Sequence, residues 1–170
     1  MVNRNDQKAK SHYLFPGTIF AHRQPHLVTT VLGSCVAVCI WHPQAQVGGI
    51  NHYLLPLWNG EGLPTPKYGN IAITRLVEKV RSLAGDGELI AKVFGGASMW
   101  FLSDQALSVG QLKVELAFDL LAEQKIKIVS QDVWGELGRK IIFDTGTGKV
   151  LLRRNQGVAN RTALKTKPRS

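Results

Sequence analysis

The sequence predicts an α+β fold with a mostly antiparallel sheet and few helices. Two observations support this class: strand-like segments follow one another in hairpins, and only two segments have a helical period. Short loops at 42–46 (HPQAQ) and 144–148 (DTGTG) join neighbouring strand segments, which indicates antiparallel hairpins. A doubly wound α/β fold would instead alternate strands with helices, so we prefer the α+β class.

Two segments are predicted to form amphipathic helices that each cover a sheet. The first is 70–84, where Asn70 is available as the N-cap and Gly85 follows the last apolar position. The second is 111–124, whose expected apolar face consists of Leu112, Leu116 and Leu120, with Ala117 and Leu121 beside it.

Eight other segments are predicted to be strands, because they are short, β-branched or alternating, and bounded by turn residues. They are 17–21, 27–32, 35–41, 47–54, 89–94, 125–130, 139–143 and 149–153. The strand 35–41 (CVAVCIW) is apolar on both faces, which predicts a central position in the sheet with both faces buried.

One domain is expected, because 170 residues with 44% hydrophobic and 19% charged residues suit a single core. We expect an N-terminal extension at 1–14, the domain at 15–154 and a flexible basic tail at 155–170. No apolar run approaches the roughly 18 residues of a membrane span. The N-terminus also lacks the apolar core of a signal peptide. A cytoplasmic protein without membrane insertion is therefore expected.

The basic charge is concentrated at the C-terminal end of the chain. The net charge is +9, and the residues from Lys149 onward include seven basic and no acidic ones. Such a tail can steer the protein toward an acidic partner or simply solubilise it, and we favour the second role. Because no nucleic-acid-binding motif accompanies it, no nucleic acid partner is expected.

The two cysteines are predicted to be reduced thiols. On one strand, the Cα atoms of Cys35 and Cys39 would lie about 13 Å apart at ~3.3 Å per residue. A disulfide requires Cα atoms within roughly 7 Å. The same separation argues against shared chelation of a metal, and the chain has no C-x-x-C pair. We therefore expect neither a metal nor another cofactor, and we interpret Cys39 as a core thiol.

Cys35 differs from Cys39 because it follows Gly33 and Ser34 directly. A Gly-Ser turn allows close approach of a ligand to the backbone and can direct N–H groups at an oxyanion. This is the environment that a cysteine nucleophile needs. A small buried structural cysteine is the competing interpretation.

A base for Cys35 is available from the neighbouring strand. A turn centred near position 44 brings a residue near 53 opposite Cys35, so His52 is expected close to the thiol. A neutral imidazole there can take the thiol proton. No Asp or Glu occurs between residues 16 and 60, so the hydroxyl of Thr29 or Thr30 is the available group to orient the ring.

Five stretches of the chain, in order, resemble the CheD family, the chemoreceptor glutamine deamidases of bacterial chemotaxis. They are VTTVLGSCVAVCIWHP (28–43), VGGINHYLLP (47–56), PKYGNIAI (66–73), KVFGGASM (92–99) and DVWGELGRKIIFDTGTGKV (132–150). The combination of LGSCVAVC, NHYLLP and FGGASM at this spacing is a specific signature, and the resemblance covers nearly the whole domain.

The resemblance implies a thiol hydrolase that converts glutamines on the cytoplasmic helices of chemoreceptors to glutamate and releases ammonia. The family's catalytic cysteine, histidine and threonine correspond to Cys35, His52 and Thr29, since the threonine stands six residues before the cysteine. It also implies a sandwich of mostly antiparallel sheets covered by two or three helices, in α/β/β layers. Expected partners are methyl-accepting chemoreceptors, as substrates, and a CheC-type phosphatase. The alternative is a noncatalytic adaptor that binds such a phosphatase or receptor.

Five residues are candidates for substrate binding. Gly95, Gly96, Ala97 and Ser98 follow a predicted strand and can admit a substrate helix close to the thiol, or can form a plain turn. Asn51 can donate to the glutamine amide or serve the strand. For Asn51 we favour the structural role.

The chain departs from the family pattern in two places. Where the family usually has I-G-x-R-N, residues 109–113 read VGQLK, so the Arg and the Asn are lost. The D-x-G-G-x-x-G-R pattern appears as DVWGELGR at 132–139, where Trp134 can be an exposed contact or a core residue. We expect these departures to affect the receptor or partner recognised more than the chemistry.

Overall fold

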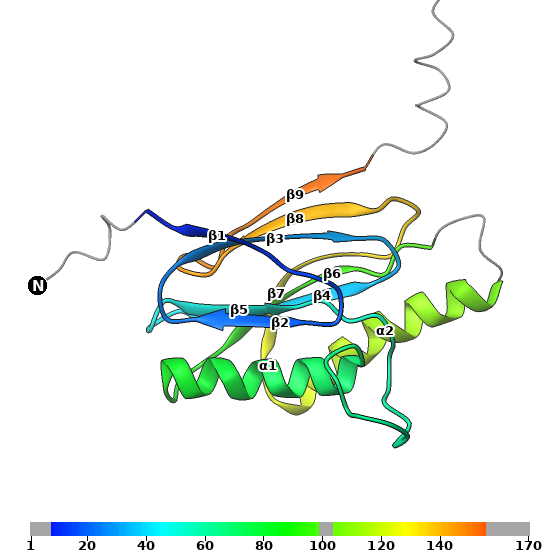
Figure 1. Cartoon of the computed structure of the whole chain (residues 1–170), viewed down its shortest axis with the longest axis horizontal. Helices are drawn as coiled ribbons and strands as arrows, with labels where there is room; N and C mark the ends of the chain where they lie inside the picture. The colour runs from blue at the N-terminus through cyan, green and yellow to red at the C-terminus, as the bar shows by residue number, and fades with distance from the viewer. Residues whose placement is uncertain (1–7, 99–103, 156–170) are drawn as a thin grey trace, which may run out of the picture.

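The computed structural model describes residues 8–98 and 104–155, which form two stacked sheets with both helices on one side (Figure 1). The first sheet has the order β1 (Lys10–Tyr13), β3 (His26–Leu32), β8 (Arg139–Asp144), β9 (Val150–Arg154). The second has the order β2 (Ile19–His22), β5 (Val47–Asn51), β4 (Val36–His42), β6 (Ile90–Gly95), β7 (Lys127–Val133). The helices α1 (Gly69–Ala84) and α2 (Asp104–Glu123) cover the outer face of the second sheet.

The α+β prediction is confirmed. Among the described strands, five pairs are antiparallel and two, β1 with β3 and β6 with β7, are parallel. Both predicted hairpins are present, because β4 pairs with β5 and β8 pairs with β9 in antiparallel fashion. The helices, the second sheet and the first sheet form three successive layers (Figure 1).

Strand β4 is central and buried on both faces, as predicted. Val36, Val38 and Ile40 pack in the core beneath the helices, whereas Ala37 and Cys39 belong to the core between the two sheets. Full burial of a valine or isoleucine side chain contributes about 1.5–3 kcal/mol. The central strand therefore joins both hydrophobic cores and holds its first residues rigidly.

The helix α2 differs from the prediction in both its start and its buried face. It begins at Asp104 rather than at 111, and it contains Gly110, whose low helix propensity obscured the first two turns. Ala117 and Leu121, which were predicted beside the leucines, are buried together with Val114, whereas Leu112 of the predicted face is 52% exposed. The buried face is displaced from the leucines because Lys113 and the small residue Ala117 occupy much of it.

The N-terminal boundary also differs from the expected one. Residues 10–13 were assigned to an extension but form β1, which pairs with β3, and Leu14 is 1% exposed in the core. All four β1 residues are exposed, so this edge strand has no apolar alternation that a sequence pattern can detect.

Residues 1–7 and 156–170, which include nearly all of the expected tail, lie outside the described residues. Within the described part of the chain, neither helix has both the length and the apolar composition required to cross a membrane.

Candidate active site

Cys35 lies at the point where the turn at Gly33 and Ser34 enters β4. Its backbone is fixed from two sides. The next residue, Val36, forms an isolated bridge with Tyr53, with N···O distances of 3.2 and 2.9 Å. On the other side, the Cys35 carbonyl accepts a hydrogen bond from the Gly96 N–H at 2.9 Å. The half-buried thiol is therefore presented by a backbone with little freedom.

His52 follows the last residue of β5 and is 2% exposed. Its N–H donates to the Thr18 carbonyl at 3.2 Å, and its carbonyl accepts from the Gly17 N–H at 2.7 Å. The bridge between Val36 and Tyr53 puts the side chains of Cys35 and His52 on the same face of the strand pair, as diagonal neighbours. The predicted thiol and imidazole thus share one face of the strand pair, with the register one residue from the predicted one.

The imidazole of His52 is oriented by Thr30. The Thr30 hydroxyl lies 2.9 Å from the Leu14 carbonyl and 2.7 Å from His52 Nδ1. A carbonyl only accepts, so the single hydroxyl proton goes to Leu14 and the Thr30 oxygen accepts from Nδ1–H. This hydrogen-bond pattern assigns the lone pair of the neutral ring to Nε2, the nitrogen available to the thiol.

The prediction that Thr29 orients His52 is wrong in this structure. Thr30 is 0% exposed and faces the other sheet, whereas Thr29 lies on the opposite face of β3 with the exposed residues Leu27 and Val31. Successive residues of a strand point to opposite faces, so only one of the two threonines can reach the imidazole.

Burial controls the ionisation of both reacting groups. It lowers the pKa of His52 from 6.5 to about 4, with a further lowering by the positive charge of Lys113. It also raises the pKa of Cys35, and Lys113 partly opposes this rise. At neutral pH the pair is therefore a thiol beside a neutral imidazole. Cys39, in contrast, is 1% exposed and its pKa is raised strongly by burial, as expected of a core thiol.

The turn before Cys35 has backbone N–H groups that are free to bind a substrate oxygen. The Gly33 carbonyl accepts from the Ala97 N–H at 3.1 Å, while Ser34 makes no hydrogen bond to any residue that the structure describes. The backbone N–H groups of Ser34 and Cys35 lie next to the thiol and are available for an oxyanion.

The segment from Gly95, the last residue of β6, to Ser98 is hydrogen-bonded to this turn. The Ala97 and Ser98 N–H groups donate to the carbonyls of Gly33 and Gly135 at 3.1 and 2.8 Å. The segment is thus a backbone support for the thiol, rather than a free loop. Gly96 and Ser98 also line a cavity of about 230 Å³, together with Gln111 and Trp134.

We expect Gly95→Ala to destabilise the protein by about 3 kcal/mol, since a positive φ and overpacking each cost ~1–3 kcal/mol. Gly95 has φ 110°, and a Cβ there would lie 2.2 Å from the Cys35 carbonyl oxygen. Urea unfolding measures the loss. The matched control is Gly85→Ala, at φ 84° but with nothing within 4 Å of the added Cβ. Equal losses in the two variants would contradict a close approach at Gly95.

Asn51 does not fit the substrate-binding role. It is 0% exposed, and its Oδ1 accepts a hydrogen bond from the Val38 N–H at 2.8 Å. Its Nδ2 has no partner among the described residues. The amide is therefore a buried structural group that takes the place of a backbone acceptor for β4.

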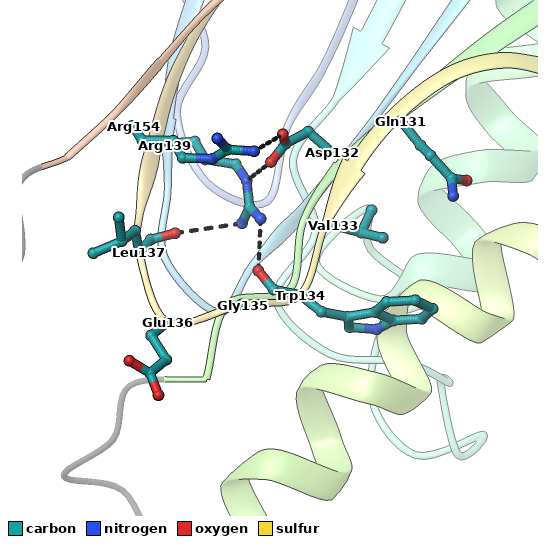
Figure 2. A pocket seen from close by; sticks show the side chains of 9 residues that line it. All are labelled: Gln131, Asp132, Val133, Trp134, Gly135, Glu136, Leu137, Arg139 and Arg154. Carbon is teal, nitrogen blue, oxygen red and sulfur yellow. Dashed lines mark hydrogen bonds and ion pairs between the residues drawn. The ribbon is translucent and has the colours of Figure 1, made fainter.

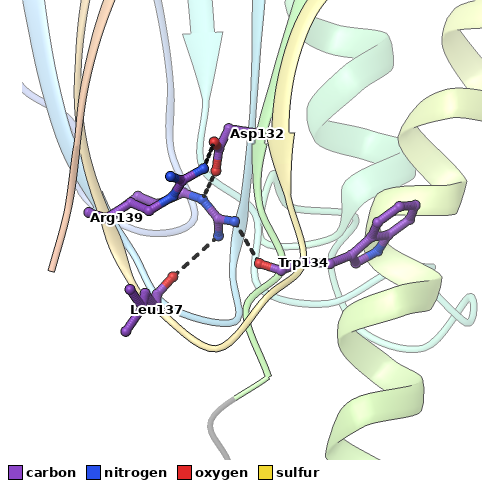
Figure 3. A network of polar contacts seen from close by, with 5 residues as sticks. Asp132, Trp134, Leu137 and Arg139 are labelled. Atoms are coloured by element: carbon purple, nitrogen blue, oxygen red, sulfur yellow. Dashed lines mark hydrogen bonds and ion pairs between the residues drawn. The ribbon is translucent and has the colours of Figure 1, made fainter. Parts of the chain in front are cut away.

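A network of polar contacts braces the loop after β7 (Figure 3). Arg139, which is 3% exposed, donates to Asp132 Oδ1 at 2.5 Å and to the carbonyls of Trp134 and Leu137 at 2.6 and 3.4 Å. Arg154 from β9 contacts the other carboxylate oxygen of Asp132. The loop is thereby tied to both sheets.

The braced loop borders a cavity of about 560 Å³ (Figure 2). The backbone of this loop is hydrogen-bonded to the segment from Gly95 to Ser98, because the Trp134 N–H donates to the Gly95 carbonyl at 2.9 Å. The Trp134 indole is 39% exposed and packs edge-on against Phe118 of α2, with ring centres 6.0 Å apart. Trp134 therefore combines the two roles considered for it: one part of the indole packs against α2, and the other part is exposed.

A cysteine at a Gly-Ser turn, with a neutral, oriented imidazole on the same face, has the groups that a thiol-dependent hydrolase requires. The family model described as "CheD chemotactic sensory transduction" matches residues 54–154. The chain belongs to the CheD family, as the sequence resemblance predicted.

Relatives match over most of the chain, including the segments before residue 54. A protein of Trichlorobacter lovleyi, named "Probable chemoreceptor glutamine deamidase CheD", is 47% identical over 92% of this chain and 98% of its own length. A protein of Sulfurimonas denitrificans with the same name is 44% identical over 83% of this chain and 92% of its own length.

Proposed function

We propose that this protein is a glutamine deamidase that converts glutamines on the cytoplasmic helices of chemoreceptors to glutamate and releases ammonia. Relatives at 44–47% identity carry the name of this activity. The structural observation that supports it is the hydrogen bond between Thr30 and His52, since it leaves Nε2 as a proton acceptor on the face that holds Cys35. The protein would act in the cytoplasm, where these receptor helices lie.

The reaction proceeds in two halves. His52 Nε2 takes the thiol proton as Cys35 Sγ attacks the glutamine Cδ, and the backbone N–H groups of Ser34 and Cys35, at the turn begun by Gly33, hold the oxyanion. The C–N bond then breaks, and ammonia leaves with the proton from His52. Water, deprotonated by the again neutral imidazole, cleaves the thioester and gives glutamate and the free thiol.

Thr30→Val is expected to lower kcat by about ten- to a hundredfold, the effect of a misplaced catalytic group. The substitution removes the acceptor for Nδ1–H, so the imidazole loses its orientation. KM should change little, because Thr30 is 0% exposed and does not meet substrate. Steady-state ammonia release measures both constants.

The matched control is Thr29→Val on the exposed face of the same strand, which should retain near-wild-type kcat. Thr30→Ser, which keeps the hydroxyl, should restore most of the rate. If Thr29→Val were the slower variant, Thr29 would orient the imidazole after all.

Mass spectrometry of a receptor cytoplasmic fragment tests the proposed activity. Wild-type protein should add about 1 Da at specific glutamines, since an amide becomes a carboxyl through the thioester. If the fragment binds but its glutamines keep their mass, the protein is a noncatalytic adaptor. The comparisons favour the enzyme, because the relatives are named as deamidases.

We place the receptor helix across the cavity lined by Gly96, Ser98, Gln111 and Trp134. This cavity lies close to the backbone of Cys35, because the N–H of Gly96, which lines it, is bonded to the Cys35 carbonyl. Binding of a CheC-type phosphatase stays a prediction of the sequence resemblance.

A further inference from the structure

Lys113 is a buried cation without a carboxylate partner. It lies on α2, is 3% exposed and forms no ion pair with any acidic group that the structure describes. Lysine is rarely buried to this extent unless its charge is paired, because removal of an ammonium from water is costly. Another group of opposite charge close to this helical turn would offset part of that cost.

The backbone of Lys113 is attached to the strand bridge that aligns the candidate site. The hydroxyl of Tyr53 donates to the Lys113 carbonyl at 2.6 Å, and Tyr53 is the residue after His52. Tyr53 also pairs with Val36, the residue after Cys35. One buried tyrosine thus connects the helix to both reacting residues.

A second contact connects the turn of α2 that contains Lys113 with the backbone of Cys35. Gly96 donates to the Cys35 carbonyl at 2.9 Å. A Cβ on Gly96 would lie 2.5 Å from Val114 and 3.3 Å from the Gly110 carbonyl. The turn 110–114 of α2 therefore packs directly on the residue that is hydrogen-bonded to Cys35.

The electrostatics of the site agree with a position of the Lys113 charge near the thiol. Burial raises the pKa of Cys35, and the charge of Lys113 opposes that rise. Burial likewise lowers the pKa of Lys113, and the Cys35 thiolate opposes that fall. Lys113 also lowers the pKa of His52.

The other titratable groups around the thiol do not compete with this pair. The phenol of Tyr53 stays protonated because burial raises its pKa. Asp132 and Arg139, on the adjacent braced loop, are paired with each other. Glu115, on the same helix, is exposed and accepts a hydrogen bond from Gln111.

We propose that Lys113 is the counter-ion of the Cys35 thiolate. In a cysteine–histidine pair the imidazolium commonly supplies this positive charge, but His52 is neutral here at working pH. Lys113 supplies the positive charge instead and leaves His52 free to act as a base. The role of Lys113 in turnover rests on the proposed deamidase function, whereas its effect on the thiol does not.

The pH dependence of Cys35 alkylation by iodoacetamide tests this assignment without a receptor. We expect Lys113→Met to shift the profile to higher pH and to slow alkylation near neutral pH by about tenfold, or roughly one pKa unit. Lys113→Gln should shift the profile in the same direction as Lys113→Met. Lys113→Arg should stay near the wild type, because a guanidinium remains charged. Lys79→Met, on the exposed face of α1, removes the same charge elsewhere and should leave the profile unchanged.

Two results would overturn the assignment. A Lys113→Met profile equal to those of wild type and Lys79→Met would mean that the charge does not act on the thiol. An Arg variant shifted as far as the Met variant would mean that packing, or proton transfer by the lysine, matters instead. Failure of the proposed function appears separately, as wild-type protein that alkylates normally but leaves receptor glutamines unchanged.

Discussion

Cys35→Ala is expected to reduce ammonia release from a receptor fragment by at least about 10⁴-fold, because the covalent route is lost with its nucleophile. The other cysteine cannot replace it: Cys39 is 1% exposed and its pKa is raised by burial. The fold should persist, since the sulfur that is removed is only half-buried, at the margin of the core between the sheets. Ammonia release and urea unfolding check the two halves of the prediction.

Cys39→Ala is the matched control, because it removes the same atom from the core between the sheets. It should keep activity and lose about 1 kcal/mol of unfolding free energy, the cost of a small cavity. If Cys35→Ala retained activity, or if a folded Cys39→Ala variant lost it, Cys35 would not be the nucleophile.

The Cys35–His52 pair was predictable because the hairpin loop 42–46 is short and the register is continuous. The pairing of β4 with β5 keeps one register from the turn to the bridge between Val36 and Tyr53. Counting outward from the turn therefore came within one residue of the observed register. A bulge along the hairpin would have moved the imidazole to the other face.

The choice between Thr29 and Thr30 could not be made from the sequence of β3. Its pattern HLVTTVL is apolar on both faces, so alternation does not show which face is inside. The distinction comes from the second sheet, which covers Val28, Thr30 and Leu32. Tertiary packing therefore determines which threonine is hydrogen-bonded to His52, and the six-residue spacing to the cysteine does not.

Lys113 was missed because a lysine in an amphipathic helix is normally assigned to the solvent side. Its placement inside also explains why the predicted face of α2 was displaced: Leu112 is exposed, and Lys113 and Val114 are buried. The departure from the family pattern at 109–113 was the one signal in the sequence. We expect this departure to change the partner recognised, whereas the structure shows that the turn 110–114 packs against Gly96, whose N–H is bonded to the Cys35 carbonyl.

His52→Gln is expected to lower kcat by about 10²–10⁴-fold, the usual contribution of a general base. Glutamine retains a similar volume and can still donate to Thr30, but it cannot take the thiol proton. Ammonia release measures this loss. Alkylation of Cys35 should continue at high pH, because the thiol can still ionise directly, and this distinguishes loss of the base from loss of the fold.

The pH dependence of wild-type stability gives a second, independent readout of His52. Its folded pKa, about 4, lies below the usual 6.5, so folding favours the neutral ring. This contribution, about 3 kcal/mol, is fully present above pH 6.5 and is lost as pH falls toward 4. His52→Gln should remove that part of the slope between pH 6.5 and 4. An unchanged slope would mean that His52 titrates normally and that the imidazole is not a buried neutral base.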